Sequence, residues 1–202
     1  MVGGHADQSF AAIERLIEGV EGVVSFGICG GLDPALASGT MLLPRAVLDE
    51  KKGQRYPVDD TWHAVLAAAL RSAHMEIVED DVLGSGAIIA TPAEKALLFK
   101  RTMACAVDLE SHVVARMAQN ARIPFVALRV IADPAWQALP PAALVPLDAE
   151  GRPMLPQVLR SIAAQPRQIP DLIRVALETR RALSVLRRGA RVLGGAAYKK
   201  AE

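Results

Sequence analysis

Four charged side chains in this sequence interrupt or follow strongly apolar runs. Asp108 and Glu110 stand two residues apart after one such run. Arg129 interrupts the apolar run 125–131, and Asp133 follows shortly after that run ends. Because an unpaired buried charge is very costly, we expect Arg129 to pair with Asp108 or Glu110.

A glycine-rich segment accompanies these charged residues. It contains the small residues Gly27, Cys29, Gly30 and Gly31, which would let backbone amides approach a ligand closely. It lacks the Gly-Lys-Ser/Thr of a phosphate-binding loop and has the wrong spacing for a dinucleotide fingerprint. Placed together, the loop, the carboxylate pair, the arginine and the terminal aspartate would suit a neutral, polyhydroxylated ligand with a basic heterocycle.

Each of these features also has a purely structural interpretation. Asp108 and Glu110 could be ordinary acids at a helix N-terminus, and Arg129 could belong to a buried structural ion pair. Asp133 precedes a proline and could serve a cap or turn. The glycine segment could be a tight turn. The residues taken singly leave these alternatives open.

The elements that must position these residues alternate along the chain. We expect strands at 23–28, 41–48, 82–89, 104–107 and 124–131, a hairpin turn at 51–54, and helices at 7–18, 61–73, from 91, 110–121, 156–164 and 171–188. This alternation predicts an α/β fold with a mostly parallel sheet and helices outside it. Ligands bind beyond the carboxyl ends of strands in such sheets, so the residues after 28, 107 and 131 should share one rim.

The composition excludes several classes of protein. A chain of 202 residues that is 51% hydrophobic and 22% charged predicts one folded domain rather than a disordered protein. An aromatic content of 4% argues against a nucleic-acid partner that stacks on aromatic rings. The two cysteines form no disulfide framework, the histidines lack metal-ligand spacing, and no apolar run approaches the roughly 18 residues of a membrane span. We therefore expect a cytoplasmic protein without a metal or cofactor.

Positive charge is concentrated at the end of the chain. Residues 167–202 hold nine Lys/Arg against three Asp/Glu, whereas the whole chain has a net charge of +1. This basic helical segment could be a solvated surface, or it could contact an anionic membrane through a face carrying Leu172, Ala176, Leu183 and Leu186. The alternative for that face is a helix packed on the domain.

Three motifs together resemble the purine nucleoside phosphorylase/nucleosidase superfamily. They are Gly27–Leu32, Val107–Ser111 and Arg129–Asp133, and their order and spacing match the family. The resemblance is strongest to methylthioadenosine/S-adenosylhomocysteine nucleosidases. Within these, SFGICGGLDPAL, AVDLESHVVARMA, PFVALRVIADPA and ALPPAAL resemble a hopanoid-associated "phosphorylase" subgroup, thought to remove adenine from adenosylhopane.

The resemblance implies a role for each matching residue. Asp133 would be the general acid that protonates purine N7, and Glu110 would bond the ribose hydroxyls. Arg129 would hold the attacking water together with Glu110, and Leu109 would pack under the sugar. The remaining expected substrate-binding residues are Gly27, Cys29, Gly30, Gly31 and Asp108. The resemblance also implies a single-domain, three-layer fold with a mixed sheet, and a homo-oligomer.

Departures from the family pattern shape the predicted reaction. Ser25 stands where the phosphorylases carry an arginine and Ile28 where they carry a serine, which favours water over phosphate as the acceptor unless another arginine, such as Arg45, substitutes. Ala132 replaces the serine that would orient Asp133. The family's first strand, with its glutamate, is apparently missing before residue 7. Three hypotheses follow: a nucleosidase, a phosphate-dependent phosphorylase, and a truncated non-catalytic nucleoside-binding protein.

Overall fold

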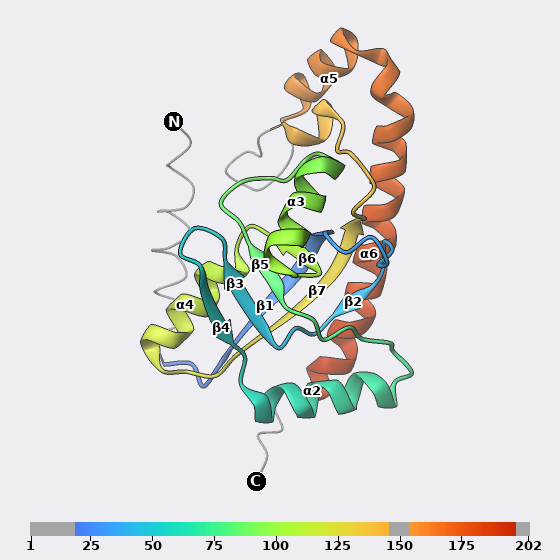
Figure 1. Cartoon of the computed structure of the whole chain (residues 1–202). Helices are drawn as coiled ribbons and strands as arrows, with labels where there is room; N and C mark the ends of the chain where they lie inside the picture. Colours follow the sequence, from blue (N-terminus) through green and yellow to red (C-terminus); the bar gives the residue numbers. More distant parts are fainter. Residues whose placement is uncertain (1–18, 146–153, 197–202) are drawn as a thin grey trace.

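The computed structural model describes residues 19–145 and 154–196, and these form a mixed sheet flanked by helices (Figure 1). The strands are β1 (Val23–Gly31), β2 (Met41–Leu42), β3 (Ala46–Asp49), β4 (Gln54–Pro57), β5 (Val82–Gly84), β6 (Ala106–Asp108) and β7 (Phe125–Asp133). The helices are α2 (Asp60–Ser72), α3 (Pro92–Thr102), α4 (Ser111–Ala121), α5 (Leu155–Ala164) and α6 (Ile169–Ala196), with short 3-10 turns at Pro141–Leu144 and Pro166–Gln168. The predicted helix 7–18 and the predicted absence of a first strand fall outside the described residues.

The seven strands follow the order β2-β7-β1-β6-β5-β3-β4. β1 pairs with β7 in parallel from Val23 to Gly30, and β6, β5 and β3 form a second parallel group. The two groups join where the end of β1 crosses β6 antiparallel, through Gly30 with Val107 and Gly31 with Ala106. The other two pairings, of β2 with β7 and of β3 with β4, are antiparallel as well. The α/β fold with a mixed sheet is confirmed: the longest pairing, of β1 with β7, is parallel as expected, whereas three of the six strand pairings are antiparallel.

Proline and glycine account for the strands that differ from expectation. The predicted strand 41–48 is divided into β2 and β3, and Pro44, which has no N–H to donate, lies between them. The predicted hairpin is present as β3–β4, with Gly53 at a positive φ of 63° in its turn. The strand expected at 82–89 ends at Gly84, before Ser85 and Gly86.

Side-chain caps fix the starts of two helices. Asp59 caps α2 by accepting a hydrogen bond from the backbone N–H of Trp62 at 2.7 Å. Thr91 caps α3 in a reciprocal capping box with Glu94. The start of α3 matters for the site because it sets where the first turn of that helix meets the sheet.

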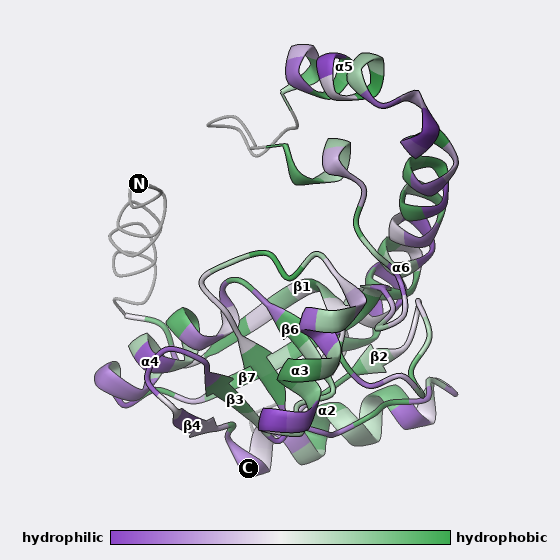
Figure 2. Ribbon diagram, turned by 45° about the horizontal axis from the view of Figure 1, so that its top comes forward, coloured by the Kyte–Doolittle hydropathy of each residue, from purple (hydrophilic) through white to green (hydrophobic). Residues whose placement is uncertain are grey.

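Helix α6 differs between its two halves. Ala182, Leu186 and Leu193 are buried in the main core, where α6 packs on β7 and β1. Figure 2 shows α5 and the beginning of α6 standing away from the sheet. The packed-helix alternative is therefore correct for the second half of α6. No helix among residues 19–145 and 154–196 is long and apolar enough to cross a membrane.

This difference gives a test of the packing. We expect Leu186→Ala to lower the free energy of unfolding by about 2–5 kcal/mol, because Leu186 is only 6% exposed. Leu177→Ala on the same helix removes the same atoms from a residue that is 59% exposed, so we expect little change. Urea unfolding followed by circular dichroism measures both. Equal losses would contradict the packing of α6.

Candidate active site

A buried ion pair lies at the centre of the candidate site. Arg129 on β7 is 3% exposed and Asp108 at the end of β6 is 5% exposed. The Arg129 Nε atom lies 2.5 Å from Oδ2 of Asp108. The guanidinium also donates hydrogen bonds to the hydroxyls of Ser25, at 2.6 Å, and Ser111, at 2.7 Å. Arg129 thus takes Asp108 as its partner, one of the two acids predicted from the sequence.

The same Asp108 carboxylate holds the start of α4. Its Oδ1 atom accepts hydrogen bonds from the backbone N–H of Glu110, at 3.1 Å, and of Ser111, at 2.9 Å. Glu110 occupies the N-cap position of α4, yet its side chain makes no capping hydrogen bond. Asp108 therefore caps the helix, and the carboxyl group of Glu110 is not used to begin it.

Gly27 makes room for the guanidinium. The register of β1 and β7 places Gly27 opposite Arg129, and a Cβ atom at Gly27 would overlap the guanidinium. The close approach permitted by this glycine is therefore used by Arg129 inside the protein. The expectation that a ligand also approaches the backbone at Gly27 stays a prediction.

Asp133 lies beside Gly30 at the end of β7. An irregularity between Cys29 and Gly30 shifts the register so that Gly30 pairs with Asp133. A Cβ atom at Gly30 would lie 3.1 Å from Oδ2 of Asp133, a tight contact that the glycine avoids. Gly30 also pairs with Val107 of β6, the strand that leads to Asp108 and Glu110. Strand register thus brings the three predicted segments to one place, as expected.

Sequence analysis missed the partner of Asp133. The ammonium of Lys95, on α3, lies 2.7 Å from Oδ2 of Asp133 and is fully buried. A signal was available, because Lys95 stands three residues before Leu98 and therefore on the buried face of α3. A lysine on an apolar helix face needs an acidic partner.

The other predicted residues divide between core and surface. Cys29 is buried in a core cluster with Cys105 and Ile131, so its side chain packs inside the protein. A Cβ atom at Gly31 would press on the backbone of Ala135 at 3.3 Å, which gives Gly31 a packing role. Leu109, by contrast, is 41% exposed and is available for contact.

The environment changes the pKa of both candidate acids in the same direction. Burial raises the pKa of Asp133, and the Lys95 ammonium opposes this shift. Desolvation and the nearby Asp108 carboxylate raise the pKa of Glu110, and Arg129 opposes them. Raised carboxyl pKa values are typical of groups that transfer or share protons in active sites.

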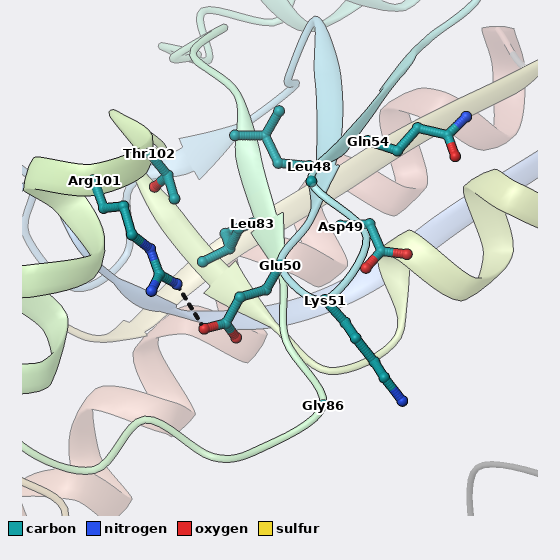
Figure 3. A pocket seen from close by; sticks show the side chains of 10 residues that line it. Leu48, Asp49, Glu50, Lys51, Gln54, Leu83, Gly86, Arg101 and Thr102 are labelled. Atoms are coloured by element: carbon teal, nitrogen blue, oxygen red, sulfur yellow. Dashed lines mark hydrogen bonds and ion pairs between the residues drawn. The ribbon is translucent and has the colours of Figure 1, made fainter.

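A hollow of about 600 Å³ lies at another part of the strand ends (Figure 3). It is lined by the β3–β4 turn, the end of β5 and the last turn of α3, and it contains an ion pair of Arg101 with Glu50 at 2.9 Å. Neither Glu110 nor Asp133 lines this hollow. It is therefore distinct from the strand ends that lead to Glu110 and Asp133.

Known structures share this fold. A putative methylthioadenosine nucleosidase from Weissella paramesenteroides is 19% identical with a TM-score of 0.58, covering 63% of this chain and 64% of that one. Futalosine hydrolase of Helicobacter pylori gives the same four values. A methylthioadenosine/S-adenosylhomocysteine nucleosidase from Helicobacter pylori is 15% identical with a TM-score of 0.61, covering 93% of this chain and 75% of that one. The chain thus spans about 64% of the length of the first two structures.

The mixed-sheet α/β fold is thus shared with these solved structures. A family model described as the phosphorylase superfamily matches residues 1–142. This chain belongs to the phosphorylase superfamily, as its motifs suggested. A search of curated protein sequences finds no match. The finer resemblance to the hopanoid-associated subgroup stays a prediction.

The role of Gly27 can be tested by stability. We expect Gly27→Ala to lower the free energy of unfolding by about 1–3 kcal/mol, because the new methyl group displaces a buried, paired guanidinium. Gly194→Ala is the matched control: nothing lies near its Cβ position, and alanine favours a helix by up to about 1 kcal/mol. Chemical denaturation of both variants measures the effect. An unchanged stability of Gly27→Ala would show that the guanidinium lies elsewhere.

Proposed function

We propose that this protein cleaves the N-glycosidic bond of an adenine nucleoside and releases adenine, with water as the acceptor. The observation that carries this proposal is the placement of Asp133 at the end of β7 and of Glu110 two residues after β6, because both strands pair with Gly30. Membership of the phosphorylase superfamily supports it, as do the nucleosidases that share the fold. One of these, from Colwellia psychrerythraea, was solved in complex with adenine.

In the proposed reaction the two carboxyl groups do different work. Asp133 protonates N7 of the base, which makes adenine a better leaving group, and a positioned acid is worth roughly 10²–10⁴-fold in rate. The ribosyl group becomes positively charged and resembles an oxocarbenium ion. Glu110 bonds the sugar hydroxyls and offsets this charge, with Leu109 under the ring. Arg129 acts through Asp108, which sets the position of Glu110.

Water is favoured over phosphate as the acceptor because the side chains that could bind phosphate already have partners within the protein. The hydroxyl of Ser25 accepts a hydrogen bond from Arg129, and Ser25 is 5% exposed. Arg45, the arginine that could have substituted, pairs with Glu79. A phosphate-dependent phosphorylase is the alternative. Either reaction would use only side chains of the protein as catalytic groups, without a cofactor, and the phosphorylase would take phosphate as its co-substrate.

A non-catalytic nucleoside-binding protein is the second candidate. The buried Lys95 ammonium favours the ionised form of Asp133, and an ionised acid has no proton to give to the base. Ala132 also lacks the hydroxyl expected beside the family acid. These two features favour binding without turnover, although burial works against them by favouring the protonated form.

Purified protein incubated with adenosylhopane, methylthioadenosine or adenosine, with and without phosphate, tests these alternatives. We expect adenine and a free sugar, at a rate independent of phosphate, measured by chromatography. Glu110→Gln and Asp133→Asn should each lower kcat at least about 10²-fold, whereas Glu21→Gln at an exposed site should not change it. A ribosyl 1-phosphate product would establish the phosphorylase, and binding without release the second candidate.

We further propose that α5 and the first half of α6 contact an anionic membrane, which would suit a lipid-linked nucleoside. Leu155, Leu159, Ile173 and Leu177 are 56–68% exposed on this part of the chain. The exposed Arg160 and Arg167 lie among them and complement anionic headgroups. The face expected from the sequence is wrong, because its Leu186 belongs to the core. Cytoplasmic location and a homo-oligomer stay predictions.

Vesicle sedimentation tests this surface. We expect binding to phosphatidylglycerol-containing vesicles that falls with salt, and little binding to pure phosphatidylcholine. Ile173→Ser with Leu177→Ser should weaken it several-fold. Leu97→Ser, at a 63% exposed site on α3, should not. A change of oligomeric state with unchanged vesicle binding would instead make this face a subunit interface.

A further inference from the structure

Lys95 is fully buried, and all three of its N–H donors have partners. Nζ donates to Oδ2 of Asp133 at 2.7 Å, to the carbonyl oxygen of Pro134 at 2.9 Å and to that of Gln137 at 3.0 Å. An ammonium taken out of water costs several kcal/mol unless it is paired and fully hydrogen-bonded. The chain therefore satisfies every donor of a buried ammonium at the end of β7, where the proposed acid lies.

The surrounding structure fixes both partners of this pair. The capping box of Thr91 and Glu94 sets the start of α3 and so the first turn, which carries Lys95. The loop after β7 is held against the segment before α3 by a hydrogen bond from Leu139 N–H to the carbonyl of Ala90, at 2.9 Å. Across the carboxyl, Gly30 leaves just enough room for Asp133. The acid is thus held between Lys95 and the backbone of β1.

We propose, on the basis of the proposed function, that Lys95 is a positioning residue for Asp133. It holds the carboxyl group in place and stabilises the carboxylate that remains after Asp133 gives its proton to purine N7. In that step the electron pair of the C1′–N9 bond goes to the departing base, and Lys95 keeps its own proton. Water then adds to C1′, and the proton that it loses restores the acid.

The charges facing Asp133 set the direction of the expected pH effect. Burial raises the pKa of Asp133, whereas Lys95 from α3 lowers it both as a charge and as a hydrogen-bond donor. Cys29 on β1 stays neutral, because burial raises the pKa of its thiol well above the usual value. Removing the ammonium therefore raises the pKa of Asp133. Since only the protonated acid is active, activity should persist to higher pH.

The test compares Lys95→Met, Lys95→Arg and Lys95→Gln with wild type. In Lys95→Met we expect kcat to fall roughly 10–100-fold, KM to change less than about threefold, and the alkaline limb of the kcat profile to move up by about 1–3 pH units. Lys95→Arg should restore the limb. Lys100→Met, on the exposed side of α3, is the matched control and should leave both parameters unchanged. A lower kcat with an unmoved limb would overturn the proposal.

A second measurement separates this inference from the proposed function. The carboxyl ¹³C signal that disappears in Asp133→Asn can be titrated in wild type and in Lys95→Met without any substrate. We expect a higher midpoint in the variant, and Lys95→Gln serves where the methionine variant does not fold. An identical midpoint would overturn the role of Lys95. A raised midpoint in a protein that releases no adenine would overturn the proposed function and retain the effect of Lys95 on Asp133.

Discussion

The arrangement at the strand ends depends on one buried guanidinium in an otherwise apolar strand. Leaving Arg129 without its partner would cost several kcal/mol, so the neighbouring strands must supply acceptors and space. Asp108 and the hydroxyls of Ser25 and Ser111 supply the acceptors, and Gly27 supplies the space. Because Asp108 also begins α4, the need to pair a charge in the core fixes the position of Glu110 at the surface.

The two ion pairs of the site, Asp108 with Arg129 and Asp133 with Lys95, have different consequences because the two carboxylates have different further contacts. Asp108 bonds to Arg129 through one oxygen and to the backbone of α4 through the other, so it fixes the start of that helix. Asp133 lies at the end of its strand, is less deeply buried, and takes its ammonium partner from a different helix. One pair therefore orders a helix, while the other controls the charge of a group that can face a ligand.

Local rules predicted much of this from the sequence, and tertiary register decided the rest. The apolar run around Arg129 predicted both the strand and the need for an acidic partner, and the helix expected from residue 91 is present as α3. The role of Gly27 was not predictable, because it depends on which residue of a distant strand lies opposite. Lys95 was missed although its spacing from Leu98 indicated the buried face of α3, and only the structure identifies Asp133 as its partner.

The proposed preference for water over phosphate as the acceptor also depends on the Arg129 guanidinium. By resemblance, the phosphorylases place an arginine on β1 at the position of Ser25. Here the cation comes from β7 instead, and Ser25 receives one of its hydrogen bonds inside the protein. A guanidinium that is 3% exposed and bonded to a carboxylate and two hydroxyls has little capacity left for a phosphate ion. The internal pairing that positions Glu110 therefore also argues against a phosphate site there, and both properties follow from burying a single arginine.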